Sequence, residues 1–461
     1  MKFASLCLTT LFVLLTSARA DDPTKGTHLL LDSRVIQSTQ NARLTLGTVE
    51  KHPANPLMAE DRPWEVRFDN LYANVVLDPA DKLYKCWYSP FIVDLPSKGL
   101  SIEQRHSTRY RPPPGREMGV CYAVSEDGLK WVKPELGVVE FEGSKANNLV
   151  LRGPHGAGVT CDDAEPDPQR RYKMFRAEDM RYSADGVHWS EAVASEDTGV
   201  RSDTHNNMVR GPDGKSWAGF VRLFNKSGGV RERVVGRTES ADLKHWTKAV
   251  EVLRCDPENQ AYAMPVFRHG DVYLGLLAVI RTKEDRVHTE LAWSPDTATW
   301  QRIQAGTPFI GNATNEGDYD WGCVYAAASP VVNKDEIRIY YGGSNGKHTS
   351  WRDGFLCLAT LRPDGWAGYE PVDDQSTAII TTRPVTCSGS RLWITCDAHD
   401  GGQVKVTAFD ESGNVTGSAV VTRTGTRVPA GQLEPLLNRP VVLRMEIHNA
   451  KVYSFGFADA L

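Results

Sequence analysis

The sequence has no apolar run approaching the ~20 residues of a membrane-spanning helix, no Cys-x-x-Cys motif and no excess of basic residues. The first absence argues against a membrane span in the mature chain, and the second argues against a structural zinc site. The net charge of −5 gives no basic footprint, so we expect no nucleic-acid partner. Helical periodicity is also missing, so we expect a chain built almost wholly from strands.

The first twenty residues have the pattern of a secretory signal peptide. An apolar run over residues 6–15 follows a basic start, and Ala18-Arg19-Ala20 is a small-x-small cleavage site. The apolar run is too short to span a bilayer. We therefore expect a secreted or periplasmic protein that begins, after cleavage, at Asp21.

Eight cysteines remain once the predicted signal, with Cys7, is removed. An even number in an oxidising compartment permits disulfides, although a chain this long does not need them. Cys86 and Cys121 lie on strands that we expect to be neighbours, so they form one candidate pair. Buried free thiols are the alternative.

A short phrase recurs along the chain: Ser-x-Asp, with a Trp four residues after the Asp. It occupies residues 125–131, 183–189, 240–246 and 294–300, so the tryptophans recur every 54–58 residues. A period of roughly 50 residues with strand-turn-strand content is typical of a β-propeller, in which each repeat is one four-stranded blade. We expect the Asp to cap an outer turn through backbone N–H groups and the Trp to pack between blades.

Five segments share one design: a strand, a tight polar turn and a second strand. They cover residues 71–88, 159–175, 205–221, 262–277 and 324–341, and a degenerate fifth copy of the phrase ends at Trp366. Beyond about residue 370 the phrase is lost and short alternating strands follow, as in a β-sandwich. The sequence therefore predicts an all-β protein, with a five-bladed β-propeller over residues 21–369 and a C-terminal β-sandwich over residues 370–461.

Acidic residues stand near the expected start of the inner strand in every blade. The first strand of each blade lines the channel of a propeller, so these acids should converge on one funnel. They are Glu65 and Asp69 in the first blade, Asp162 and Asp163 in the second, Asp203 in the third, Glu258 in the fourth, and Glu316, Asp318 and Asp320 in the fifth. Crowding and burial push carboxyl pKa values apart, and glycoside hydrolysis needs that separation.

We assign catalytic roles to Asp69, Asp203 and Glu258. The residues predicted to bind substrate are Glu65, Asp163, His205, Asn206, Asp320 and His348. Either histidine could bond a sugar hydroxyl or hold structure. Acid oxygens could hold a central Ca²⁺, but no contiguous loop has calcium-ligand spacing, so we expect no metal and no cofactor. The arginine-bearing loop 98–116 could wall the funnel, and its charge would suit an anionic glycan.

Several segments resemble secreted bacterial proteins related to the invertase-type and arabinanase-type glycosidases. They are residues 64–65, 84–88, 125–137, 147–148, 171–174 and 339–343. The resemblance implies a five-bladed propeller, with a C-terminal β-sandwich in the invertase type, and three funnel acids from successive blades. By position these would be Asp69 or Glu65, then Asp163 or Asp203, then Glu258. The chain lacks the Asn-Asp-Pro-Asn-Gly start and the Glu-Cys pair of invertases, which argues against a fructosidase.

These patterns predict a glycoside hydrolase acting on a plant or algal polysaccharide or its oligosaccharides, with carbohydrate as its partner. Two alternatives stay open. The first is a propeller that binds glycans without cleaving them. The second is a sialidase-like enzyme, suggested by the Ser-x-Asp…Trp turn, although sialidases normally have six blades and an arginine triad on inner strands.

Overall fold

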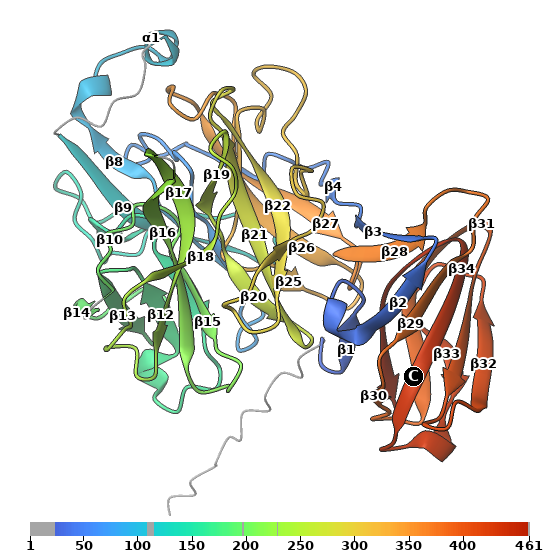
Figure 1. Ribbon diagram of the computed structural model, residues 1–461. Helices are drawn as coiled ribbons and strands as arrows, with labels where there is room; N and C mark the ends of the chain where they lie inside the picture. The colour runs from blue at the N-terminus through green and yellow to red at the C-terminus, as the bar shows by residue number, and fades with distance from the viewer. Residues whose placement is uncertain (1–23, 108–114, 196–197, 228, 460–461) are drawn as a thin grey trace, which may run out of the picture.

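The computed structural model describes residues 24–107, 115–195, 198–227 and 229–459 (Figure 1). The expected signal over residues 1–20 lies outside this part of the chain, as does the 108–114 portion of the arginine-bearing loop. The one α-helix among the described residues is α1 (Ile102–His106), and strands dominate elsewhere. No helix in the described ranges is long and apolar enough to cross a membrane. The prediction of an all-β fold is confirmed.

The larger domain is a five-bladed propeller whose blades follow one another in chain order (Figure 1). The first blade contains β6 (Asn74–Leu77), β7 (Tyr84–Tyr88), β8 (Phe91–Asp94), β9 (Arg116–Ser125) and β10 (Leu149–Arg152). The second contains β11 (Gly158–Cys161), β12 (Tyr172–Phe175), β13 (Asp179–Ser183) and β14 (Val193–Ala194). The third contains β15 (Asn207–Arg210), β16 (Trp217–Ser227), β17 (Val230–Ser240) and β18 (Val250–Leu253).

The fourth and fifth blades are joined by one parallel pair, Val287 with Cys323. The fourth contains β19 (Asn259–Ala263), β20 (Val266–His269), β21 (Val272–Arg281), β22 (Arg286–Ser294) and β23 (Gln301–Arg302). The fifth contains β24 (Cys323–Ala326), β25 (Val331–Val332), β26 (Ile337–Ser344) and β27 (Gly354–Leu361). Two short strands from the N-terminal part of the chain, β4 (Glu50–Lys51) and β5 (Met58–Ala59), pair with β27 and complete this blade.

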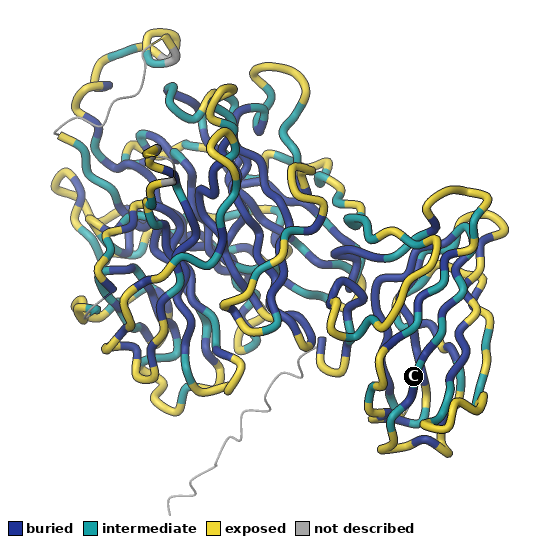
Figure 2. Tube along the Cα trace, viewed as in Figure 1, coloured by how far each residue is buried: buried dark blue, intermediate teal, exposed yellow. Residues whose placement is uncertain are grey.

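The first strands of all five blades line a central channel. At the end of the channel where these strands finish there is a cavity of about 500 Å³, and every blade contributes to its wall. Buried segments run through the blades, whereas the connecting loops are mostly exposed (Figure 2). The channel therefore has two mouths, one where the inner strands begin and one where they end.

The C-terminal strands form one large sheet that folds over its own apolar core, which includes Leu392, Val406 and Met445. Its strands are β28 (Ala367–Pro371), β29 (Ala378–Thr382), β30 (Val385–Thr386), β31 (Arg391–Phe409), β32 (Val415–Val421), β33 (Gly425–Gln432) and β34 (Pro440–Ala458). The predicted combination of a propeller and a β-sandwich is confirmed.

Three N-terminal strands also belong to the sandwich sheet, although the sequence pattern places residues 21–369 in the propeller. They are β1 (Thr27–Leu29), β2 (Ile36–Gln40) and β3 (Ala42–Leu46), which pair with β34, β29 and β28. A sheet edge left unpaired would present open N–H and C=O groups, and these strands cover such edges. The chain therefore begins in the sandwich, passes through the propeller and returns to the sandwich.

The repeated Ser-x-Asp…Trp phrase has the architectural role predicted for it. One carboxylate oxygen of Asp127 accepts the backbone N–H groups of Leu129 and Lys130, each at 2.8 Å. The same turn recurs at Asp185, Asp242 and Asp296. Each Trp packs on an aromatic ring of the neighbouring blade, in the pairs Trp131–Tyr340, Trp189–Trp87, Trp246–Phe175 and Trp300–Phe220.

All eight cysteines within the described ranges are free thiols. Cys86 and Cys121 lie on the adjacent strands β7 and β9, as expected, but Cys86 is opposite Ala123 and Cys121 is opposite Tyr88. The candidate disulfide is therefore not formed. Both cysteines are buried, in agreement with the alternative of buried thiols.

Candidate functional site

Polar and aromatic side chains gather at the mouth where the inner strands begin. Most come from the segment just before an inner strand or from the strand itself. They are Asp69 and Tyr72 before β6, His155 before β11, Asp203 and His205 before β15, Tyr262 in β19, Tyr325 in β24, and His348 and Arg352 between β26 and β27. We call this set the β6 mouth.

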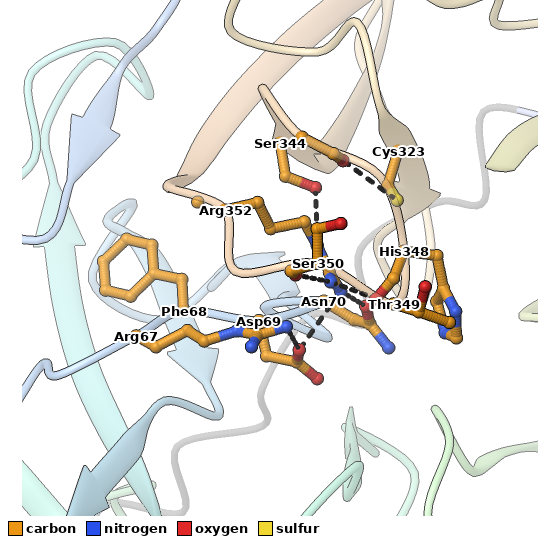
Figure 3. A network of polar contacts seen from close by, with 12 residues as sticks. Arg67, Phe68, Asp69, Asn70, Cys323, Ser344, His348, Thr349, Ser350 and Arg352 are labelled. Atoms are coloured by element: carbon orange, nitrogen blue, oxygen red, sulfur yellow. Dashed lines mark hydrogen bonds and ion pairs between the residues drawn. The ribbon is translucent and has the colours of Figure 1, made fainter. Parts of the chain in front are cut away.

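Asp69 is the anionic centre of the β6 mouth. Its Oδ1 atom lies 2.5 Å from Nη2 of Arg67 and 3.1 Å from Nη2 of Arg352 (Figure 3). Burial alone would raise the pKa of Asp69, but the two guanidinium groups outweigh burial and hold that pKa well below its usual range. Asp69 is therefore ionised throughout the neutral and mildly acidic range.

The backbone that carries Asp69 is strained. Asp69, Leu71 and Tyr72 have φ angles of 54°, 60° and 45°, which is left-handed backbone that favours glycine. Each such residue costs roughly 1–3 kcal/mol and persists only where the surroundings hold it in place, and strain of this kind concentrates at functional sites. Arg352 supplies part of that support, because its Nη2 also donates to the Asn70 side chain at 2.5 Å (Figure 3).

Tyrosine and histidine rings form the floor of the mouth. The Tyr72 ring lies 5.2 Å from the His155 ring and 5.5 Å from the His205 ring. The Tyr262 ring lies 5.0 Å from His348, and its hydroxyl is 3.0 Å from Nε2 of that histidine. Burial lowers the pKa of His205 to about 3, so this imidazole is neutral at any working pH.

Asp203 reaches the same mouth from the third blade. Its carboxylate pairs with the guanidinium of Arg222, and its side chain is 75% exposed. Burial lowers the pKa of His155, and the charges of Asp69 and Asp203 both oppose that shift. Asp69 and Asp203 therefore both act electrostatically on His155, from the first and the third blade of the β6 mouth.

Glu258 is not among the groups assembled at the floor. Its side chain is 61% exposed on the rim, where it pairs with Lys283 at 2.6 Å. The backbone carbonyl of Glu258 accepts the N–H of Thr282, which ties it to the β21–β22 hairpin. In the described structure, the fourth blade contributes Tyr262 to the floor instead of this acid.

Three predicted binding residues also lie elsewhere. Glu65 is buried against Lys133 at 2.6 Å and accepts the Tyr88 hydroxyl at 2.6 Å. Asp320 is buried with Lys51 at 2.6 Å. Asp163 follows β11 rather than preceding it, and pairs with Arg171 at the far end of the channel.

The other predicted residues lie at or beside the β6 mouth. His205 contacts the Asn74 side-chain oxygen at 3.1 Å through Nε2. Asn206 is buried next to it, and its amide nitrogen donates to the Gly156 carbonyl at 2.9 Å. His348 lies between Tyr262 and the carboxylate of Asp285, 3.8 Å from the latter. Asn206 thus holds the backbone, whereas His205 and His348 contact the aromatic floor.

Sequence reasoning missed the arginines that surround Asp69, and it missed Tyr72 and Tyr262. Arg67 stands two residues before Asp69, a spacing that brings both side chains to one face of an extended segment. Arg352 gives no local signal, since 283 residues separate it from Asp69. The loop 98–116 does reach this region: Arg105 stands 5.2 Å over the Trp351 ring, beside Arg352.

A second carboxyl with a shifted pKa lies close behind Asp69. Burial raises the pKa of Glu60 from 4.5 to about 8, although this side chain accepts the backbone N–H groups of Phe68 at 2.5 Å and Gly354 at 3.1 Å. The neighbouring charge of Asp353 raises the pKa further. Glu60 is therefore mostly protonated at pH 7, whereas the nearby Asp69 is ionised.

We expect Glu60→Gln to flatten the pH dependence of stability. Between pH 4.5 and 8 the folded protein holds a proton on Glu60 that the unfolded chain releases, so stability falls as the pH rises through that window. The variant should match the wild type at pH 4 and exceed its unfolding free energy by roughly 3 kcal/mol at pH 9, allowing for partial exposure. Urea unfolding at both pH values measures this. Glu126→Gln, in an exposed turn, is the control, and identical slopes for Glu60→Gln and the wild type would refute the shift.

No three His, Cys, Asp or Glu side chains in the described part of the chain are grouped so that they could hold a metal ion. No protein-family model matches the sequence, and no curated protein matches it either.

Solved structures with a similar fold are remote in sequence. An N-acetylgalactosamine deacetylase from F. plautii, in complex with blood group B trisaccharide, is 14% identical, has a TM-score of 0.47 and covers 68% of this chain and 95% of its own. A structure from work on the GH130 family of mannoside phosphorylases, which contains glycoside hydrolases that target β-1,2-mannosidic linkages in Candida mannan, is 14% identical, with a TM-score of 0.47 and coverages of 71% and 97%. A family 43 arabinoxylan arabinofuranohydrolase from Bacillus subtilis, in complex with cellotetraose, is 10% identical, with a TM-score of 0.39 and coverages of 89% and 99%.

Proposed function

We propose that the protein is an exported glycoside hydrolase whose active site is the β6 mouth, with Asp69 and Asp203 as its carboxyl pair. The observation that carries the proposal is Asp69 itself. It is an ionised carboxylate on strained backbone, clamped by Arg67 and Arg352 at the centre of the mouth. Strain maintained at this position is expected of a catalytic group and is costly for a purely structural one.

The chemistry of glycoside hydrolysis fits these two acids. One carboxylate must stay ionised, either to activate water or to attack the sugar, and a second carboxyl must exchange a proton with the leaving oxygen. Asp69 supports the first role because its charge is fixed by two guanidinium groups. Asp203 supports the second because its carboxyl is 75% exposed at the mouth, where a leaving group could reach it.

The surrounding side chains suit a carbohydrate. Tyr72, Tyr262 and Tyr325 present ring edges and hydroxyls, and the buried hydroxyl of Tyr325 has no hydrogen-bond partner among the described residues. Tyrosine rings and hydroxyls can contact sugar rings and bond sugar hydroxyls. The proposed substrate is a plant or algal polysaccharide or its oligosaccharides.

Reducing-sugar release from neutral, uronate-containing and sulfated polysaccharides tests the proposal, measured between pH 4 and 9. Asp203→Asn should lower the rate on any active substrate by about 10²-fold or more, because proton transfer is lost. Glu258→Gln, a matched change on the rim, should leave the rate within about twofold of the wild type. Glycan binding by calorimetry without cleavage at any pH would instead establish a glycan-binding propeller.

A further inference from the structure

Three arginines stand on the third-blade wall of the β6 mouth around one aromatic ring. Arg222 on β16 and Arg231 and Arg233 on β17 lie 4.7, 3.8 and 5.8 Å from the centre of the Phe224 ring. Phe224 is 38% exposed, so this wall is open to solvent. The two strands pair with Phe224 opposite Arg233, which places the guanidinium groups on one face.

The positive charge of this wall is only partly neutralised within the protein. Asp203 pairs with Arg222, whereas Arg233 has no carboxylate partner among the described residues and donates to the Gln260 side-chain oxygen at 3.0 Å. The Nε atoms of Arg222 and Arg233 are buried and donate to no acceptor in the described ranges. Burial, together with the charge of Arg222, lowers the pKa of Arg233, as expected for adjacent cations.

Arg222 and Arg233 both reach into the floor of the site. Their guanidinium carbons stand 5.2 and 5.6 Å from the centre of the Tyr262 ring. Arg222 is 8% exposed, so a buried guanidinium with an unused N–H group is held directly above the floor. Planar guanidinium groups bind oxyanions through paired N–H donors, and a neutral sugar hydroxyl cannot offset their charge.

We propose that the substrate carries an oxyanion, a uronic acid carboxylate or a sulfate ester, which binds to Arg222 and Arg233 above Tyr262. This inference rests on the proposed function, because it assumes that a glycan occupies the β6 mouth. It adds the charge of that glycan, which the catalytic acids alone do not specify. An anionic ligand would use the unpaired N–H donors and relieve the repulsion between the two arginines.

Calorimetry with matched ligands tests the inference on the whole protein. The probes are an oligogalacturonide, the same oligosaccharide with its carboxyl groups methyl-esterified, and a sulfated oligosaccharide. We expect an anionic probe to bind about 10- to 100-fold more tightly than the ester, the effect of one charged hydrogen-bonded contact. Preference for the carboxylate or for the sulfate identifies the group. Equal affinities for all three would overturn the inference.

Arg233→Gln supplies the residue-level test. It should remove most of the preference for the anionic probe and leave binding of the methyl ester unchanged. Arg237→Gln, the same change on the same strand at a residue paired with Glu239, should leave the preference intact. Equal losses in both variants would overturn the assignment to Arg233. If a variant does not fold, the affinities of the wild-type protein for the three probes still test whether the ligand is anionic. Charge-selective binding without cleavage would refute the proposed hydrolase activity but support the anionic ligand. Cleavage of a neutral glycan without charge preference would support the hydrolase activity and refute the anionic ligand.

Discussion

Asp69→Asn should lower glycoside cleavage by about 10²- to 10⁴-fold, because the amide cannot carry the charge that activates water or attacks the sugar. The substitution keeps the shape of the side chain and leaves Arg67 and Arg352 facing a neutral oxygen. The loss should be of similar size at every pH tested, because Asp69 is ionised over that range in the wild type. Initial rates on the best substrate from the polysaccharide panel measure the effect.

Stability offers a second readout for the same variant. The pKa of Asp69 is depressed in the folded protein, so its ion pairs stabilise the fold above its ordinary pKa of 3.8, and that contribution is lost as the pH falls toward the lower folded value. The difference in unfolding free energy between the wild type and Asp69→Asn should therefore be constant near pH 7 and shrink in strong acid. Asp163→Asn, at the far mouth, is the control. Wild-type rates in Asp69→Asn would remove Asp69 from the mechanism.

Arg352→Met should destabilise the protein by about 3–5 kcal/mol, the usual cost of removing one partner from a buried ion pair. Arg352 is 1% exposed, and its guanidinium bonds the side chains of Asp69, Asn70 and Ser344. Methionine fills similar space but leaves Asn70 and Ser344 without this donor, and it leaves Asp69 paired with Arg67 alone. Urea unfolding at pH 7 measures the loss.

Arg286→Met provides the matched control, because Arg286 is partly exposed and bonds only backbone carbonyls within the described structure. Its loss should stay near 1 kcal/mol. Combining Arg352→Met with Asp69→Asn should cost less than the sum of the two single changes, since both changes remove the same ion pair between Arg352 and Asp69. A loss below 1 kcal/mol for Arg352→Met would show that the clamp on Asp69 is not needed for the fold.

Local chemistry explains why the architecture could be predicted. The Asp127 turn depends on residues only a few positions apart. The Trp246–Phe175 contact joins neighbouring blades, and it could be expected because the Trp recurs with the period of the repeat. Asp69 could be placed at a channel mouth for a similar reason, because it stands shortly ahead of the apolar inner strand β6. The same reasoning misplaced Asp163, because this acid follows β11 (Gly158–Cys161) and so lies at the other end of the channel.

Long-range pairing explains what could not be predicted. The clamp on Asp69 joins Arg67 with a loop residue from the last blade, and nothing near either arginine identifies the other. The group of arginines on the third-blade wall depends on the pairing of two long strands, β16 and β17, which brings Arg222 and Arg233 together across a hairpin. Glu258 has the right residue type and position in the sequence, yet the hairpin that carries Lys283 holds it on the rim.

The N-terminal strands also fix the order in which the molecule can assemble. β1 pairs with β34, the last strand in the chain, and β4 and β5 supply the outer edge of the fifth blade. The sandwich is complete only when β1 has paired with β34, and the fifth blade only when β4 and β5 have paired with β27. Neither domain can therefore close until its last strands have been synthesised. We expect the propeller and the sandwich to unfold as one cooperative unit.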